Sequence, residues 1–538
     1  MRRFIKIFLL ALTAISCKCI YAQSENNPYT IHSDTNKVIQ IIYASHLRQI
    51  TINDSTILET LSGKASVKQG NTVLSGDSII LNKRLGTLEV FGNVHINDAD
   101  TVNTYSQYLK YIGNEQVAYL EKNVKFSDGK AKLFTDNLIY NIKTGIANYT
   151  NGGKIINEKT ILTSKEAVYY SDTRDVFFQN NVHLTDPKYD MLADSLRYNT
   201  FFKNAYFISP THIKSKNGII DTKSGTYNLQ TGEALFLDNT SFRDSNIFMS
   251  GNKIAFDEKN DLIQIEENGK LVDSLNKVIV IGNQILIDKK KNTFLATRKP
   301  VMILYQKNDS TYISADTLYS GKRAIENNQM PKADTLIKKK KKQPIIKSAD
   351  SIRYFIGFHH VRIFNDSIQA VSDSLHYSSS DSTFKLLGNP LCWNGETQLA
   401  GDTMYLFTQN QQPKEIQVFY NAIVVNKTKE GFFNQMCGKT INGYFDNGKI
   451  NYLRTKGSPA ESIFYPQDDD SAYIGMNKSK GDVIDIFFKE QAVFKIKYIN
   501  EVSGTLYPIG QIPQSTSKLK NFSWQEKRRP KNKLEIFE

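Results

Sequence analysis

The chain has 538 residues, with 68 basic against 54 acidic side chains and a formal net charge of +14. Apolar residues make up 40% and charged residues 23%, a balance that excludes wholesale disorder. Four cysteines exclude a disulfide scaffold, and 28 Tyr and 30 Phe against 13 Pro favour β-strands.

The first 22 residues have the pattern of a cleaved secretory signal. A basic start at residues 2–6 precedes a nine-residue apolar run, 7–15, which is too short to span a bilayer as a helix. The small-residue pattern ending at Ala22 predicts cleavage there, and a second interpretation is a lipoprotein signal with Cys17 as the anchor. Removal of the four basic residues of this segment leaves a mature charge of +10 out of +14.

A repeat of about 29 residues follows. Turn-forming residues recur at spacings of 29 or 30, and they are Lys64, Asn93, Asn123, Gly152, Asn181, Pro210, Asn239 and Asn268. Three positions before each of them stands an apolar residue: Leu61, Val90, Leu120, Tyr149, Phe178, Phe207, Phe236 and Ile265. Three positions after each of them stands another: Val67, Ile96, Phe126, Ile155, Leu184, Ile213, Phe242 and Leu271.

Around these two apolar columns the chain alternates with a period of two, which is typical of half-buried strands. Asn and Gly tolerate left-handed backbone, and Pro has no N–H for a ladder, so the central position suits a bend or a bulge. Each repeat is therefore predicted to form two strands with a corner between them. Because one repeat cannot bury its apolar face alone, stacked copies should build one continuous apolar interior.

The pattern divides the rest of the chain. We expect a β-repeat domain over 23–320, and a linker or loop over 321–347, which holds five consecutive lysines. A second, degenerate repeat block follows over 348–508, and then a polar basic tail over 509–538.

The sequence carries no pattern that points to catalysis. No HExxH occurs, the mature chain lacks CxxC, and no GxSxG is present, so we predict no enzyme, cofactor, metal site or nucleic-acid partner. Cys392 and Cys437 remain after the signal, and in an oxidising compartment they could pair, although sequence does not show their separation.

The repeat resembles the OstA-like family of periplasmic lipopolysaccharide-transport proteins. The resemblance lies in Ser75–Leu81 with Leu88–Ile96, in Asp175–Leu184 and in Leu192–Tyr198, and it extends well over 50–320 and weakly over 348–508. It implies an all-β fold, in which tandem antiparallel strand repeats form an open jelly-roll-like groove. The repeat pattern of this chain predicts two consecutive blocks of such strands, and the second block is a departure from the family pattern. The resemblance also implies a periplasmic, non-enzymatic protein whose groove shelters the acyl chains of lipid A on the way to the outer membrane.

On this resemblance the two columns, from Val90 and Ile96 to Ile265 and Leu271, become candidates for the lipid groove. The mature charge of +10 suits the anionic head group of lipopolysaccharide. Free sheet edges would join other Lpt-type transport proteins, or further copies of this chain head to tail. The first strand supplies the edge candidates Ile39, Ile41 and Tyr43.

Two alternatives stay open from the sequence. The first is a parallel β-helix acting as a surface or polysaccharide-binding protein, in which the recurring Asn would stack along the coil. The second is an envelope scaffold that binds only proteins. Antiparallel neighbouring strands would favour the groove, and parallel in-register strands would favour the β-helix. If the chain is a scaffold that binds only proteins, its depletion should leave lipopolysaccharide delivery unchanged.

Overall fold

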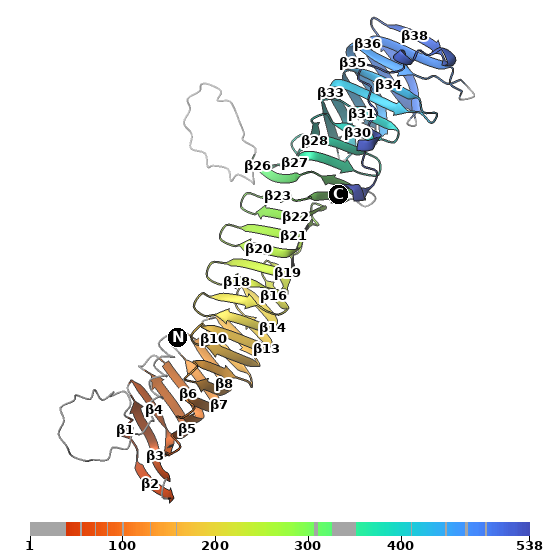
Figure 1. Cartoon of the computed structure of the whole chain (residues 1–538). Coiled ribbons are helices and arrows are strands. Elements are labelled where there is room, and N and C mark those ends of the chain that lie inside the picture. Colours follow the sequence, from red (N-terminus) through yellow and green to blue (C-terminus); the bar gives the residue numbers. More distant parts are fainter. Residues whose placement is uncertain are drawn as a thin grey trace, which may run out of the picture. The chain divides into compact units, whose positions relative to one another are not determined.

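The computed structural model describes residues 39–324 and 351–537, apart from short gaps at 54–55, 70, 83, 99–101, 128, 130, 158, 306–309, 410–411, 447–448, 469–471 and 490–491. The predicted signal and most of the predicted linker lie outside these residues. The chain divides into two compact units, residues 1–245 and 246–538, and both are built from β-strands (Figure 1). Within the described ranges, no helix is long and apolar enough to cross a membrane.

The first unit contains strands β1 to β19. Their bounds are β1 Gln40–Tyr43, β2 His46–Asn53, β3 Thr56–Gln69, β4 Thr72–Asn82, β5 Thr87–Asp98, β6 Val102–Ile112, β7 Val117–Ser127, β8 Ala131–Asn141, β9 Ile146–Tyr149, β10 Gly153–Asn157, β11 Thr160–Ser164, β12 Glu166–Tyr170, β13 Asp175–Thr185, β14 Tyr189–Asn199, β15 Asn204–Phe207, β16 Thr211–Ser215, β17 Gly218–Thr222, β18 Ser224–Asn228 and β19 Glu233–Arg243. Each of the long strands β3 to β8 pairs antiparallel with the next one. From β9 on, some repeats are split into two short strands, which continue the same ladder in two halves.

A corner divides each repeat at the predicted turn residue. The register of β5 against β6 shifts between Phe91 and Val94, where Gly92 and Asn93 both have positive φ. The same left-handed backbone occurs at the other predicted turn residues, which are Lys64, Asn123, Gly152, Asn181, Asn239 and Asn268. Pro210 is the exception, and the corner there falls in the break between β15 and β16. Two successive left-handed residues redirect a strand, so each repeat contributes to two half-sheets.

Side chains also brace these corners. The Asn93 amide nitrogen donates to both carboxylate oxygens of Asp77 on the neighbouring strand, at 3.2 and 3.1 Å. Gly92 has a φ of +67°, and a Cβ at this position would collide with the same carboxylate. Asn421 and Asp402 repeat the arrangement in the second unit, with two bonds of 3.1 Å. At both of these corners, an aspartate on or just before the neighbouring strand therefore holds the asparagine of the corner.

The two half-sheets of the first unit share one core. Leu61, Ile79 and Val90 from one side of the corner pack in the same cluster as Val67 and Ile96 from the other side. The corner thus folds the apolar faces of the half-sheets against each other, which confirms the predicted apolar interior.

The second unit contains strands β20 to β38. Their bounds are β20 Ile247–Asp257, β21 Leu262–Asp273, β22 Val278–Asp288, β23 Thr293–Thr297, β24 Val301–Tyr305, β25 Ser310–Ser314, β26 Thr317–Ala324, β27 Ser351–Phe364, β28 Gln369–Ser378, β29 Thr383–Leu387, β30 Leu391–Asn394, β31 Thr397–Ala400, β32 Thr403–Gln409, β33 Gln412–Lys427, β34 Phe433–Asp446, β35 Lys449–Phe464, β36 Gly475–Lys489, β37 Ala492–Ile499 and β38 Ser503–Pro508. Long strands again alternate with split ones, since β22, β27, β28, β33 and β36 each pair with two short strands. Strands β26 and β27, which stand on either side of residues 325–350 in the sequence, pair antiparallel with each other.

The antiparallel pairing decides between two of the folds considered from the sequence. Neighbouring strands run in opposite directions in every strand pair of the described residues whose register is defined, as in β3 with β4 and β33 with β34. A parallel β-helix requires in-register parallel neighbours, so that alternative is wrong. The all-β, antiparallel fold class is confirmed.

The C-terminal segment 509–537 differs from the predicted polar tail. It contains four short 3₁₀ turns, η2 Ile509–Gln511, η3 Gln514–Thr516, η4 Glu526–Arg528 and η5 Lys533–Ile536. Leu519 and Ile536 are each 3% exposed, so this segment packs on the second unit although it is rich in lysine and arginine.

Left-handed corners lead to a stability prediction. Asn123 has a φ of 56°, a conformation that costs a β-branched residue about 1–2 kcal/mol and costs glycine almost nothing. We expect Asn123→Val to lower the urea midpoint of the full chain, whereas Asn123→Gly should leave it nearly unchanged. A valine variant as resistant to urea as the original chain would show that this corner does not require the left-handed backbone.

Candidate functional site

The candidate groove residues lie in the interiors of the two units. In the first column Val90, Leu120, Tyr149, Phe178, Phe207, Phe236 and Ile265 are all at most 4% exposed. In the second column Ile96, Leu184, Ile213 and Phe242 are at most 7% exposed, and Phe126, Ile155 and Leu271 are half-buried. Ile265 and Leu271 belong to the second unit, and the other candidates belong to the first.

The strand register brings the first column together. Val90 lies opposite Leu109, Leu109 opposite Leu120, and Leu120 opposite Leu138, so one apolar row crosses four strands. Further along, Phe178 lies opposite Leu196, which in turn lies opposite Phe207. The period of two within strands and the 29-residue period between repeats together place these side chains on one face.

Aromatic rings add buried apolar surface in the middle of this row. The rings of Phe207 and Phe236 stack with centroids 5.7 Å apart and an interplanar angle of 18°. Gly225 lies between them in the ladder, with a φ of +149°, and a Cβ there would press on the backbone of Phe236. The missing side chain lets the two rings meet across the intervening strand, an arrangement favourable for aromatic pairs.

Several polar groups beside the apolar columns are neutral hydroxyls. The Tyr149 hydroxyl lies 2.7 Å from the Ser164 hydroxyl, which donates to the Glu166 carbonyl at 2.9 Å. Burial raises the pKa of Tyr149 above its ordinary value, and it raises the pKa of Tyr111 to about 12. Thr222 and Thr240 share another buried hydroxyl contact of 2.8 Å. At neutral pH these groups carry no charge, so they do not oppose an apolar ligand.

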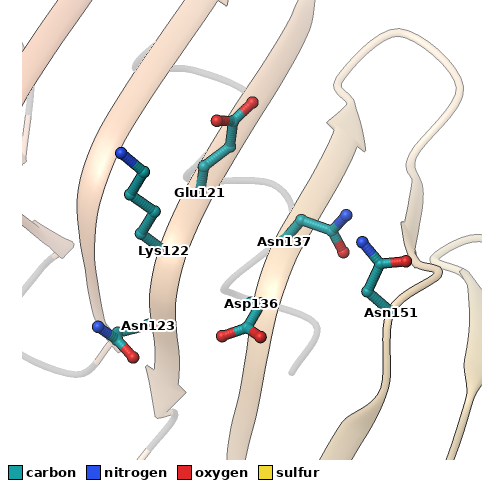
Figure 2. Close-up of a pocket in the computed structure, with 6 residues that line it drawn as sticks. All are labelled: Glu121, Lys122, Asn123, Asp136, Asn137 and Asn151. Atoms are coloured by element: carbon teal, nitrogen blue, oxygen red, sulfur yellow. The ribbon is translucent and has the colours of Figure 1, made fainter.

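A polar hollow of about 550 Å³ lies at the corners of the first unit (Figure 2). Its lining is Glu121, Lys122, Asn123, Asp136, Asn137 and Asn151. Figure 2 shows Asn137 and Asn151 directed toward each other between β8 and the loop before β10. One cation among two carboxylates and three amides gives this hollow no surplus of positive charge. Its polar walls do not suit an acyl chain, so we do not assign the lipid site to it.

The N-terminal strands leave an edge in the first unit. Within the described residues, β1 and β2 pair with β3 and with no other strand of known register. Of the predicted edge residues, Ile41 is 51% and Tyr43 is 55% exposed, whereas Ile39 is half-buried against the core. Sequence reasoning missed β2, which exposes Leu47 and Ile52. Its alternation of apolar and polar residues could have indicated a second edge segment.

Among the described residues, the cysteines and the other potential metal ligands are not gathered into one centre. Cys392 and Cys437 are both free, so the pairing left open by the sequence is absent. Burial raises the pKa of the Cys392 thiol to about 12 and that of Cys437 to about 11, so both stay protonated at neutral pH. Within the described ranges, no group of three or more His, Cys, Asp or Glu is placed to hold a metal ion.

Comparisons with known proteins agree with the family resemblance of the repeat. Residues 36–194 match the family model of OstA-like proteins. A solved structure of LptH, the LptA homologous periplasmic component of the lipopolysaccharide transport device from Pseudomonas aeruginosa, is similar at 16% identity with a TM-score of 0.19, covering 21% of this chain and 83% of that chain. No curated protein matches this sequence. The family match confirms the predicted resemblance over residues 36–194.

Proposed function

We propose that this chain, which is OstA-like over residues 36–194, is a non-enzymatic carrier that shelters the acyl chains of lipopolysaccharide between the half-sheets of its first unit. The observation that carries the proposal is the continuous row of buried, uncharged side chains from Val90 to Phe236. An acyl chain in water costs about 0.8 kcal/mol per exposed methylene, so a carrier must offer apolar contact along the whole path.

The structure suggests how a lipid would enter. The interior is filled by its own side chains, and the two half-sheets of each repeat are joined through left-handed corners such as Gly92–Asn93. An acyl chain would therefore separate the facing half-sheets and replace contacts between the two columns. Aromatic side chains such as Phe178 and Phe207 would then cover the lipid with large rigid surfaces.

The predicted secretory signal and the charge support a periplasmic setting. The mature charge of +10 favours contact with the phosphates of the lipopolysaccharide head group. We also propose that the edge at β1 and β2 pairs with a sheet edge of another transport protein or of a second copy. Edge strands, which pair on one side only and expose apolar side chains, are the usual sites of such strand addition.

Photo-crosslinking in cells tests the lipid site. A benzoylphenylalanine at Phe178 or Phe207, both 2% exposed, should form adducts with lipopolysaccharide. The matched control is Phe202, which is 60% exposed in the loop after β14 and should form none. Folded protein without adducts at any interior position of the two columns would overturn the proposal.

The edge proposal gives a second expected result. Lysines at Ile41 and Tyr43 should weaken end-to-end association, because strand addition would then bury two cations beside the new ladder. Sedimentation velocity of the mature protein measures this, alone and with other Lpt-type proteins. A control with lysines at Leu85 and Leu275, which are 56% and 74% exposed, carries the same added charge. Equal loss of association in both variants would show that charge, and not the edge, is responsible.

A further inference from the structure

In the second unit, one half-sheet is buried on both faces. Along β30, Cys392 packs in the interior cluster with Val418 and Met436, whereas its neighbours Leu391 and Trp393 form a separate cluster. Strand β35 repeats this division, because Phe464 packs with the interior and Ile463 packs away from it. Since side chains alternate across a strand, the second clusters lie on the opposite face of the sheet.

The chain's own C-terminal segment covers this opposite face. Leu519 and Ile512 pack with Ile463 and Met476, and Phe433 contacts the rings of Phe522 and Trp524 at centroid distances of 5.3 and 5.6 Å. We call residues 512–537 the strap. Figure 1 shows this segment, in the darkest blue, returning from β38 toward β27.

Two buried glutamines bind the strap backbone in the same manner. The Gln435 side chain, in a residue 1% exposed, accepts from the Leu519 N–H at 2.9 Å and donates to the Ser517 carbonyl at 2.9 Å. Gln398, which is fully buried, accepts from the Gln525 N–H at 2.8 Å and donates to the Ser523 carbonyl at 2.6 Å. Each side-chain amide thus pairs with a carbonyl and with the N–H two residues later.

The two glutamine amides bind the strap backbone as a neighbouring strand would. A side-chain amide that donates to the C=O of one residue and accepts from the N–H two residues later supplies the two hydrogen bonds that one residue of a neighbouring parallel strand would make. Trp393 fixes the amide of Gln398, because its indole N–H donates to the same oxygen at 3.2 Å. The contact depends on the strap backbone and not on the strap side chains at those positions.

A third glutamine recognises a strap side chain. Arg529 donates from Nε and Nη2 to the Gln369 side-chain oxygen, at 2.9 and 2.7 Å, and from Nη1 to the Gly395 carbonyl at 2.9 Å. Gln369 is 4% exposed, and its own amide nitrogen is held by the Asn365 carbonyl at 2.7 Å. Beyond this point the strap reaches β25, where the Phe537 ring meets Tyr312 at a centroid distance of 6.3 Å.

We propose that this face of the second unit is a peptide-binding site, whose ligand in this chain is the strap bound in cis. Gln398 and Gln435 bind the ligand backbone, Gln369 receives an arginine, and Trp393 and Ile463 provide the apolar floor. The site lies on the far side of the half-sheet from the interior that holds Val418 and Met436, so it does not depend on the lipid proposal.

Cutting the connection in the folded, full-length protein tests this proposal. A recognition sequence for a specific protease, inserted at Gly510, lies in exposed chain with nothing within 4 Å of the position of a Cβ. After cleavage, the C-terminal fragment should stay bound through gel filtration. A fluorescent peptide of residues 512–538 should then exchange into the cleaved protein over time. Loss of the fragment as soon as the chain is cut would overturn the proposal.

Glutamine variants assign the binding to the named residues. Gln398→Leu with Gln435→Leu should release the fragment roughly tenfold faster or more, because four hydrogen bonds to the strap backbone are lost. The control Gln230→Leu changes an exposed glutamine of the first unit and should leave the rate unchanged. Retention equal to that of the original chain would contradict the assignment.

Peptide variants keep the test independent of sheet folding. Peptides carrying Leu519→Ser or Arg529→Met alter the ligand alone, so the cleaved protein that receives them is unchanged. Both should exchange into the site more weakly than the original peptide. Equal exchange of all three peptides would show that neither Leu519 nor Arg529 contributes to binding, and would overturn the site as proposed.

Discussion

Phe207→Ala is expected to lower the free energy of unfolding of the chain by about 3–5 kcal/mol, the range for truncating a buried phenylalanine. Phe207 is 2% exposed, lies opposite Leu196 in the ladder and stacks on Phe236. Truncation leaves a cavity inside a repeat array, where each repeat relies on its neighbours for burial. The effect should appear as a lower urea midpoint of the transition that includes the first unit.

Phe202 provides the matched comparison. It lies five residues earlier and is 60% exposed, so Phe202→Ala should change the free energy of unfolding by no more than about 0.5 kcal/mol. The two phenylalanines differ in column position and not in residue type. Similar losses for both variants would contradict the assignment of the column to the interior.

Arg454→Met is expected to destabilise the second unit by about 3 kcal/mol, because it leaves a buried carboxylate without its charged partner. The Arg454 guanidinium donates to the Asp485 carboxylate from Nε at 2.8 Å and from Nη2 at 2.9 Å. The Tyr452 hydroxyl donates to the same carboxylate at 2.7 Å. The Asp485 side chain is 4% exposed, while that of Arg454 is 40% exposed, which keeps the loss at the lower end of the range for buried pairs.

The loss of stability caused by Arg454→Met should be larger at neutral pH than at acidic pH. The hydrogen bonds from Arg454 hold the pKa of Asp485 below its ordinary value, so the pair stabilises the fold above the unfolded pKa of about 3.9. That stabilisation disappears as the pH falls through the still lower folded pKa. The difference between the original chain and Arg454→Met should therefore be largest near neutral pH and shrink below about pH 4.

Two controls accompany the arginine variant. In an Asp485→Asn background the arginine substitution should cost much less, and the double-mutant cycle isolates the pair. Lys291→Met removes a cation that is 78% exposed beside Asp288, and it should cost at most about 1 kcal/mol. Unfolding measured from pH 3 to 7 would contradict the account if the cost of Arg454→Met stayed constant over that range.

The corners and the interior follow from local rules, which is why the sequence predicts them. A positive φ selects Asn and Gly, and these residues mark the corners at Asn93, Gly152 and Asn239. The period of two then assigns the side chains three positions away to the interior. The division at residue 245 leaves no such mark, because the 29-residue spacing continues past it through Asn268.

The strap could not be predicted by the same reasoning. Its composition is polar and basic, and its contacts join residues as far apart as Gln369 and Arg529, which no local pattern reveals. A weaker signal was present in the partner strands. Leu391-Cys392-Trp393 and Ile423-Val424-Val425 are continuous apolar runs, which indicate burial on both faces of a sheet. The basic composition of residues 509–538 nevertheless led to the prediction of a polar tail.

The central claim is tested most directly by depleting this protein in its own cell and assaying newly made lipopolysaccharide at the outer surface. Delivery of new lipopolysaccharide to the surface is expected to fall as the protein is depleted. The original chain should restore delivery, whereas a variant that folds but cannot admit an acyl chain between its half-sheets should not. Unchanged delivery of lipopolysaccharide after full depletion would contradict the proposed carrier role, and would favour an envelope scaffold that binds only proteins.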